Sequence, residues 1–142
     1  MRIYSVHIKR YDWVVRVYIR DKTGVYRHEV EELLDAMASF GASEKDLERA
    51  EKNLSSMLMD GGLTYSSGMR RMSVMVLGKT SSAKEFLDSL VHEVMHASVH
   101  IARAMGLDLE GEEMCYVAGD LARELYDGCR EYLCCGCNGE GR

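Results

Sequence analysis

The chain has 142 residues, a formal net charge of −5 and 46% hydrophobic residues. This length and apolar content predict a single domain with a packed core, not a disordered chain. The acidic balance argues against a nucleic-acid partner, because phosphate binding requires clustered lysine and arginine. Residues 1–7 lack the apolar run of a secretory signal, and no stretch approaches the roughly 20 apolar residues of a membrane helix. We therefore expect a cytoplasmic protein without a membrane partner; the sequence leaves its oligomeric state open.

The N-terminal half predicts a β-hairpin followed by two helices. Apolar and polar residues alternate over residues 4–9 and 13–20, on either side of a short polar link, which is typical of paired strands. A helical stripe then begins at Val30 and stops before Gly41, and Ser43 is placed to cap a second helix.

The C-terminal half repeats this pattern with longer helices. Two short strands are expected at residues 63–66 and 72–77. A capping pattern at Ser82 opens a helix that runs to about Met105, and a fourth helix covers about residues 112–126. The order of elements predicts an α+β fold, in which a small and mostly antiparallel sheet packs on helices.

Four cysteines lie close to the C-terminus, and they divide the chain into two expected parts. Residues 1–128 are predicted to form the domain, and residues 129–142 a tail rich in cysteine and glycine. A reduced terminus is the simpler interpretation of the tail, because the paired spacing of a zinc knuckle is absent. A role in metal binding or redox chemistry stays open for these residues, which are Cys129, Cys134, Cys135 and Cys137.

The strongest chemical signal is the HExxH motif formed by residues 92–96 in the third expected helix. Residues four apart share one helix face, so His92 and His96 can both reach one zinc ion. Glu93 can take a proton from water at that ion and return it to the leaving amine, since zinc brings the pKa of the water close to neutrality. Chance copies of this motif usually lie in exposed segments, whereas this one has apolar neighbours on both sides. The motif therefore predicts a zinc-dependent hydrolase.

The third zinc ligand has several candidates. His100 lies one turn after His96, but three ligands in line on one straight helix do not surround a metal tetrahedrally. Glu112 and Glu113 open the next helix, where a glutamate would complete a gluzincin set. Helical angles place Glu112 on the side of Gly119, where a second helix could approach closely, and place Glu113 on a solvated stripe. We expect Glu112 as the third ligand and Glu113 as the alternative.

These two segments resemble the small zincin-like metallopeptidases of the gluzincin type that bacteriophages and mobile elements often encode. The resemblance rests on HExxH in one helix and on a glutamate followed by tyrosine and glycine in the next, and it covers about a third of the chain. It implies a minimal zincin-like fold and a zinc site completed by Glu112. It implies no particular substrate beyond a peptide or protein.

Further expectations concern the surroundings of the site. Residues 72–77 precede the HExxH helix, so a peptide substrate could add to the edge of that strand. Tyr116 or His100 could stabilise the transition state or support the ligands. The leading function is a metallopeptidase with Glu93 as general base. The alternative is a non-catalytic zinc-binding module that binds a partner protein; Glu93 argues against it, because a purely structural zinc site needs no such carboxylate.

Overall fold

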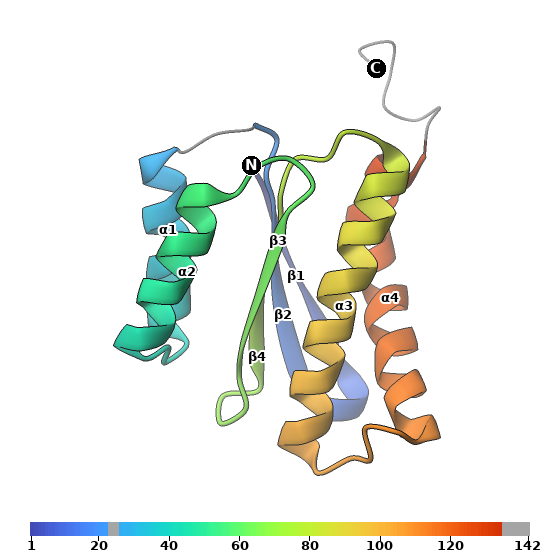
Figure 1. The fold of residues 1–142 in the computed structure, drawn as a ribbon. Helices are drawn as coiled ribbons and strands as arrows, with labels where there is room; N and C mark the ends of the chain where they lie inside the picture. The colour runs from blue at the N-terminus through green and yellow to red at the C-terminus, as the bar shows by residue number, and fades with distance from the viewer. Residues whose placement is uncertain (23–25, 135–142) are drawn as a thin grey trace.

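The computed structural model describes residues 1–22 and 26–134 (Figure 1). The first half comprises β1 (Arg2–Ile8), a 3-10 turn (Lys9–Tyr11), β2 (Trp13–Ile19), α1 (Arg27–Ser39) and α2 (Glu44–Ser56). The second half comprises β3 (Gly62–Ser67), β4 (Met72–Leu77), α3 (Ala83–Met105) and α4 (Glu112–Leu133). Two of the tail cysteines, Cys135 and Cys137, lie outside the described residues.

The four strands form one mixed sheet in the order β1-β2-β4-β3. The two outer pairings are antiparallel, as expected, whereas β2 and β4 pair in parallel at the centre. A parallel pairing needs a long crossover, and α1 and α2 together provide it. The α+β class is thus confirmed, and the expectation for the sheet is corrected at its central pair.

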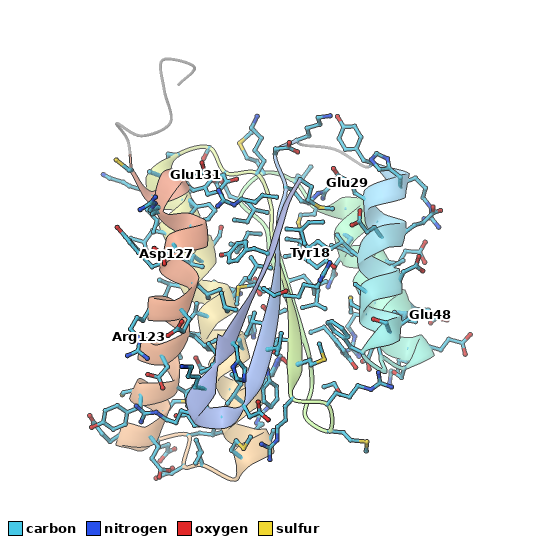
Figure 2. The ribbon with its side chains drawn as sticks, turned by 180° about the vertical axis from the view of Figure 1, so that it is seen from behind. Tyr18, Glu29, Glu48, Arg123, Asp127 and Glu131 are labelled. Carbon is cyan, nitrogen blue, oxygen red and sulfur yellow. The ribbon has the colours of Figure 1, made fainter. Side chains whose placement is uncertain are left out.

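The sheet separates two pairs of helices. α1 and α2 cover one face, and α3 and α4 cover the other (Figure 1). Because side chains alternate along a strand, Val15 and Val17 of β2 pack toward α3 and α4, whereas Tyr18 packs toward α1 and α2. Figure 2 shows Tyr18 in the layer between the sheet and α1, while Glu48 projects outward from α2. None of the helices in the described ranges is long and apolar enough to cross a bilayer.

Local capping signals fix the helix ends that the sequence predicts. The Ser43 hydroxyl accepts a hydrogen bond from the Asp46 backbone N–H at 3.1 Å, and Ser82 accepts one from Glu85 at 3.2 Å. Gly106 ends α3 in the left-handed conformation, with φ of 68°. These three predicted boundaries are confirmed. They were predictable because each depends on residues close by in the sequence.

α4 is longer than expected, which corrects the boundary at residue 128. The helix continues to Leu133, and Cys129 is fully buried in the core. The Tyr4 hydroxyl lies 3.1 Å from Cys129 Sγ, and a Cβ on Gly128 would overlap the Tyr4 ring. Residues 129–133 therefore belong to the domain, since they hold β1 against α4.

Candidate functional site

The HExxH motif occupies the middle of α3, which lies along β3 and β4. Val94, Ala97 and Ile101 point into the core and anchor the helix. His92 and His96 lie on the exposed side, whereas Glu93 turns toward β3 and is 3% exposed. A single helix thus presents two imidazoles to solvent and buries the carboxylate beside them.

The two histidines converge on one point in space. His92 Nε2 and His96 Nε2 are 3.1 Å apart, a distance at which one neutral ring donates a hydrogen bond to the other. Two zinc–nitrogen bonds of about 2.0–2.1 Å at a tetrahedral angle would place the nitrogens about 3.3 Å apart. The observed separation therefore fits two ligands of one zinc ion.

Two residues of β3 hold the carboxylate of Glu93. The Thr64 hydroxyl donates a hydrogen bond to Glu93 Oε2 at 2.6 Å. Gly62 lies against the same side chain, and a Cβ at this position would come within 2.5 Å of Glu93 Oε1. The sequence analysis assigned neither residue to the site, because their contacts with Glu93 depend on how α3 docks on β3.

A small cavity joins Glu93 to the first histidine. Its volume is about 200 Å³, and His92 and Glu93 line it together with Asp60, Gly61, Gly62, Asp88 and Ser89. Asp60 accepts hydrogen bonds from the Ser81 backbone and hydroxyl, so its carboxylate anchors a loop. The cavity provides room for a small polar molecule next to both catalytic candidates.

His100 stands at the end of a chain of hydrogen bonds that starts inside the core. Trp13 Nε1 donates to Ser73 Oγ at 2.9 Å, and Ser73 Oγ lies 2.7 Å from Ser66 Oγ. Ser66 Oγ in turn lies 2.8 Å from His100 Nδ1. The indole can only donate, whereas each serine hydroxyl can both donate and accept, so Ser66 is able to donate to an unprotonated His100 Nδ1. In that arrangement the proton of the neutral ring is on Nε2.

The surroundings of His100 favour this neutral ring. Its pKa is lowered chiefly because burial disfavours the charged form, and His96 and Arg103 lower it further. No periodic signal in the sequence connects Trp13 to a histidine of α3.

The acidic candidates of α4 lie elsewhere. α4 follows α3 after a short loop and packs against it (Figure 1), so its first turn lies beside the C-terminal end of α3. Glu112 and Glu113 are both exposed there. Within residues 1–22 and 26–134, no group of three His, Cys, Asp or Glu side chains is placed to hold one metal ion. The structure therefore brings neither Glu112 nor Glu113 together with His92 and His96.

The close helix contact expected on the Gly119 side of α4 is absent from the described residues. Gly119 is exposed, and a Cβ built there would meet no atom within 4 Å, so this side of α4 receives no close helix contact. Tyr116, a candidate for the transition state, lies under the Arg10 guanidinium at 5.4 Å and is also exposed. Asp120 of the same helix is buried, and Arg10 Nε lies 2.9 Å from its Oδ2, an ion pair without hydrogen-bond geometry.

The open edge of the sheet next to α3 is β3. β4 lies between β2 and β3, which corrects the expectation that residues 72–77 offer an edge to substrate. The bond from Gly78 N to Gly61 O sets the register, so alternate residues of β3 pair with β4. The backbone groups of Gly62, Thr64 and Ser66 therefore point away from the sheet, while the side chains of Thr64 and Ser66 face α3.

No protein-family model matches the chain, and no curated protein or solved structure shows significant similarity to it.

Proposed function

We propose that this protein is a zinc-dependent peptide hydrolase in which His92 and His96 bind the metal and Glu93 is the general base. One observation carries the proposal: two imidazole nitrogens converge at 3.1 Å beside a buried carboxylate that shares a cavity with one of them. Buried carboxylates are costly unless paired, and they concentrate at functional sites. A bound zinc ion would supply Lewis acidity and lower the pKa of a coordinated water molecule.

Glu93 is placed to move the proton. Thr64 holds its Oε2, which fixes the orientation of the carboxylate and leaves Oε1 toward Gly62. In the proposed reaction Glu93 accepts the proton of the attacking water and then delivers it to the amine that leaves. Its burial keeps competing water away and strengthens its electrostatic interactions.

His100 and β3 complete the proposed site. A neutral His100 offers its Nε2–H as a donor to the carbonyl oxygen of the substrate, where negative charge develops. The free backbone groups of Gly62, Thr64 and Ser66 suit an extended peptide, which would add to the sheet as a fifth strand. Substrate would then lie between the β3 edge and the histidines of α3.

A second function is supported by the small number of metal ligands that the described residues bring together. Because the described residues bring only His92 and His96 together, the site would also suit a protein that binds zinc loosely and recognises a partner without cleaving it. Glu112 remains the proposed third ligand of the gluzincin-like arrangement, and it would have to approach the histidines when zinc binds. Glu112→Gln tests this point: weaker zinc binding supports it, and unchanged zinc affinity contradicts it.

The decisive experiment measures zinc and hydrolysis together. The purified chain should contain about one zinc per molecule by elemental analysis and native mass spectrometry, and it should cleave members of a random peptide library. Replacing His92 and His96 with alanine should abolish both properties. The same change at His7 and His28, two exposed histidines outside α3, is the matched control and should leave both unchanged.

Three results are informative. Unchanged zinc content in the His92→Ala, His96→Ala variant contradicts the proposed ligands and would point to the C-terminal cysteines. Zinc that depends on these histidines, without cleavage of any peptide by the intact chain, supports the non-catalytic module. Loss of both properties only in this variant supports the hydrolase.

A further inference from the structure

A charged hollow lies beside the C-terminal end of β3. This hollow has a volume of about 590 Å³, and it lies between α2, the end of β3 and the last turns of α3. Two arginines line it from different helices, Arg49 from α2 and Arg103 from α3. His100 and Ser66 also line it, so the hollow adjoins the proposed active site.

The charges of these two arginines are not neutralised by the described part of the chain. Arg49 and Arg103 are exposed and have no ion pair within residues 1–22 and 26–134, whereas Arg10, Arg20 and Arg27 each have a carboxylate partner. The one carboxylate in the hollow, Asp46, accepts a hydrogen bond from Ser43 at the start of α2. Two guanidinium groups thus face one carboxylate, and a chain with a net charge of −5 keeps a local positive site at this end of β3.

The residues of β3 indicate how far the catalytic candidates lie from the arginines along an extended peptide. Thr64 contacts Glu93, Ser66 contacts His100, and a Cβ on Gly68 would lie 3.3 Å from Ala104, the neighbour of Arg103. An extended peptide advances about 3.3 Å per residue, in step with the strand to which it is paired. A peptide whose cleaved bond lies opposite Thr64 thus reaches the arginines about two to four residues away.

We propose that the β3 edge and this hollow select an extended acidic peptide, whose carboxylate binds Arg49 and Arg103 about two to four residues from the cleaved bond. Guanidinium groups suit this task because their N–H donors match the two oxygens of a carboxylate. Antiparallel pairing with β3 places the carboxylate on the N-terminal side of the bond, since the peptide would run from the Gly68 end toward Gly62. This inference rests on the proposed hydrolase for the position of the cleaved bond, but binding of the acidic peptide is independent of turnover.

The test measures binding to the full chain in the Glu93→Gln variant, so that the probe is not consumed. The probes are fluorescein-labelled decapeptides of alanine, serine and threonine with one glutamate at successive positions, each paired with the same peptide carrying glutamine. Fluorescence anisotropy should show about five- to tenfold tighter binding of the best glutamate peptide, as expected for two exposed ion pairs. Added salt should reduce this preference.

Replacing Arg49 and Arg103 with glutamine in the same background should remove the preference and leave the binding of the glutamine peptides unchanged. Arg130→Gln is the matched control, because Arg130 is exposed on α4, far from the β3 edge. Thermal melting verifies that all variants are folded. A glutamate preference that survives the double substitution overturns the proposal.

Product analysis with the intact chain separates this inference from the proposed function. Cleavage about two to four residues after the glutamate supports both. Binding that depends on the arginines without cleavage of any peptide supports the recognition site and contradicts the hydrolase. Cleavage with equal efficiency for the glutamate and glutamine peptides overturns the recognition site alone, and cleavage on the N-terminal side of the glutamate overturns the antiparallel orientation.

Discussion

The two halves of the chain follow the same order of elements, two strands and then two helices, and each half buries a carboxylate on the first of its helices. In the first half Glu29 of α1 is 6% exposed, and Arg20, itself buried, lies 3.2 Å away. In the second half Glu93 of α3 is 3% exposed, and its contact is the Thr64 hydroxyl. No ion pair involves Glu93 in the part of the chain that the structure describes.

This difference separates a structural carboxylate from one that is available for chemistry. An ion pair with Arg20 offsets the cost of burying Glu29, and it occupies that carboxylate permanently. A hydrogen bond from Thr64 orients Glu93 and places no cation beside it, so the carboxylate is not committed to an ion pair within the described residues. The two histidines beside Glu93 have no counterpart on α1. The following predictions test this contrast.

The largest effect is expected for Glu93→Gln. Hydrolysis of a peptide that the intact chain cleaves should fall roughly 100- to 10,000-fold, because glutamine keeps the shape but cannot accept a proton. Zinc content should stay the same, and the free energy of unfolding should not decrease, since the substitution removes a buried charge. Stopped assays on the peptide and urea titrations measure the two quantities. Retained hydrolysis in this variant would rule out Glu93 as the base.

The corresponding change in the first half should act on stability alone. Glu29→Gln removes the buried ion pair between Glu29 and Arg20, and it should lower the free energy of unfolding by about 3 kcal/mol. Hydrolysis by the folded fraction should be unaffected. Glu31→Gln is the control: Glu31 pairs with Arg27 on the exposed side of α1, and its loss should be undetectable in urea titrations. A stability loss of the same size for Glu93→Gln would contradict the contrast between the two carboxylates.

Gly62→Ala should disturb the position of the Glu93 side chain by a change in the neighbouring strand β3. The added Cβ would come within 2.5 Å of Oε1, so either the side chain or β3 must move. We expect a stability loss of about 1–3 kcal/mol, as for other overpacked positions, together with slower hydrolysis. Combining it with Glu93→Ala should restore much of the stability and none of the hydrolysis. Gly119→Ala, on an open face of α4, should instead stabilise the chain by about 0.5–1 kcal/mol.

The smallest effect concerns pH and His100. Its pKa in the folded chain is lower than the value of 6.5 for a free histidine, so below that pH the unfolded chain binds the extra proton first. Stability should therefore be complete above pH 6.5 and should decline as the pH falls through the lower folded value. The decline should be shallower in His100→Gln, measured by urea titration of the chelator-treated chain. Parallel curves for the two proteins would contradict a buried neutral ring.

Local signals made much of the fold predictable. Strand alternation identified the β1–β2 hairpin, and the caps at Ser43 and Ser82 fixed two helix starts, because these features involve residues a few positions apart. The sequence also placed HExxH on a helix. The parallel pairing of β2 with β4 and the position of β3 at the edge were not predictable, since tertiary packing decides which strands become neighbours.

The same distinction applies to the site. The convergence of His92 and His96 follows from helical spacing, whereas Thr64, Ser66 and the Trp13 relay come from segments far away in sequence. The end of α4 is a different case. Its apolar stripe continues from Leu125 to Cys129, four residues later, but the cysteine and glycine content of this region made it resemble a tail. At this end of α4, the spacing of apolar residues indicated the helix more reliably than the amino-acid composition did.

The contact between Tyr4 and Gly128 has a consequence for folding during synthesis at the ribosome. Tyr4 lies in β1, and the helix that receives its ring is α4, so β2, α1, α2, β3, β4 and α3 are all synthesised between the two partners of this contact. At the usual 5–20 residues per second, the N-terminal hairpin must wait on the order of ten seconds for α4. During that time the face of β1 that carries Tyr4 has no cover, so we expect nascent chains that stop short of α4 to depend on chaperones to avoid association through this apolar face.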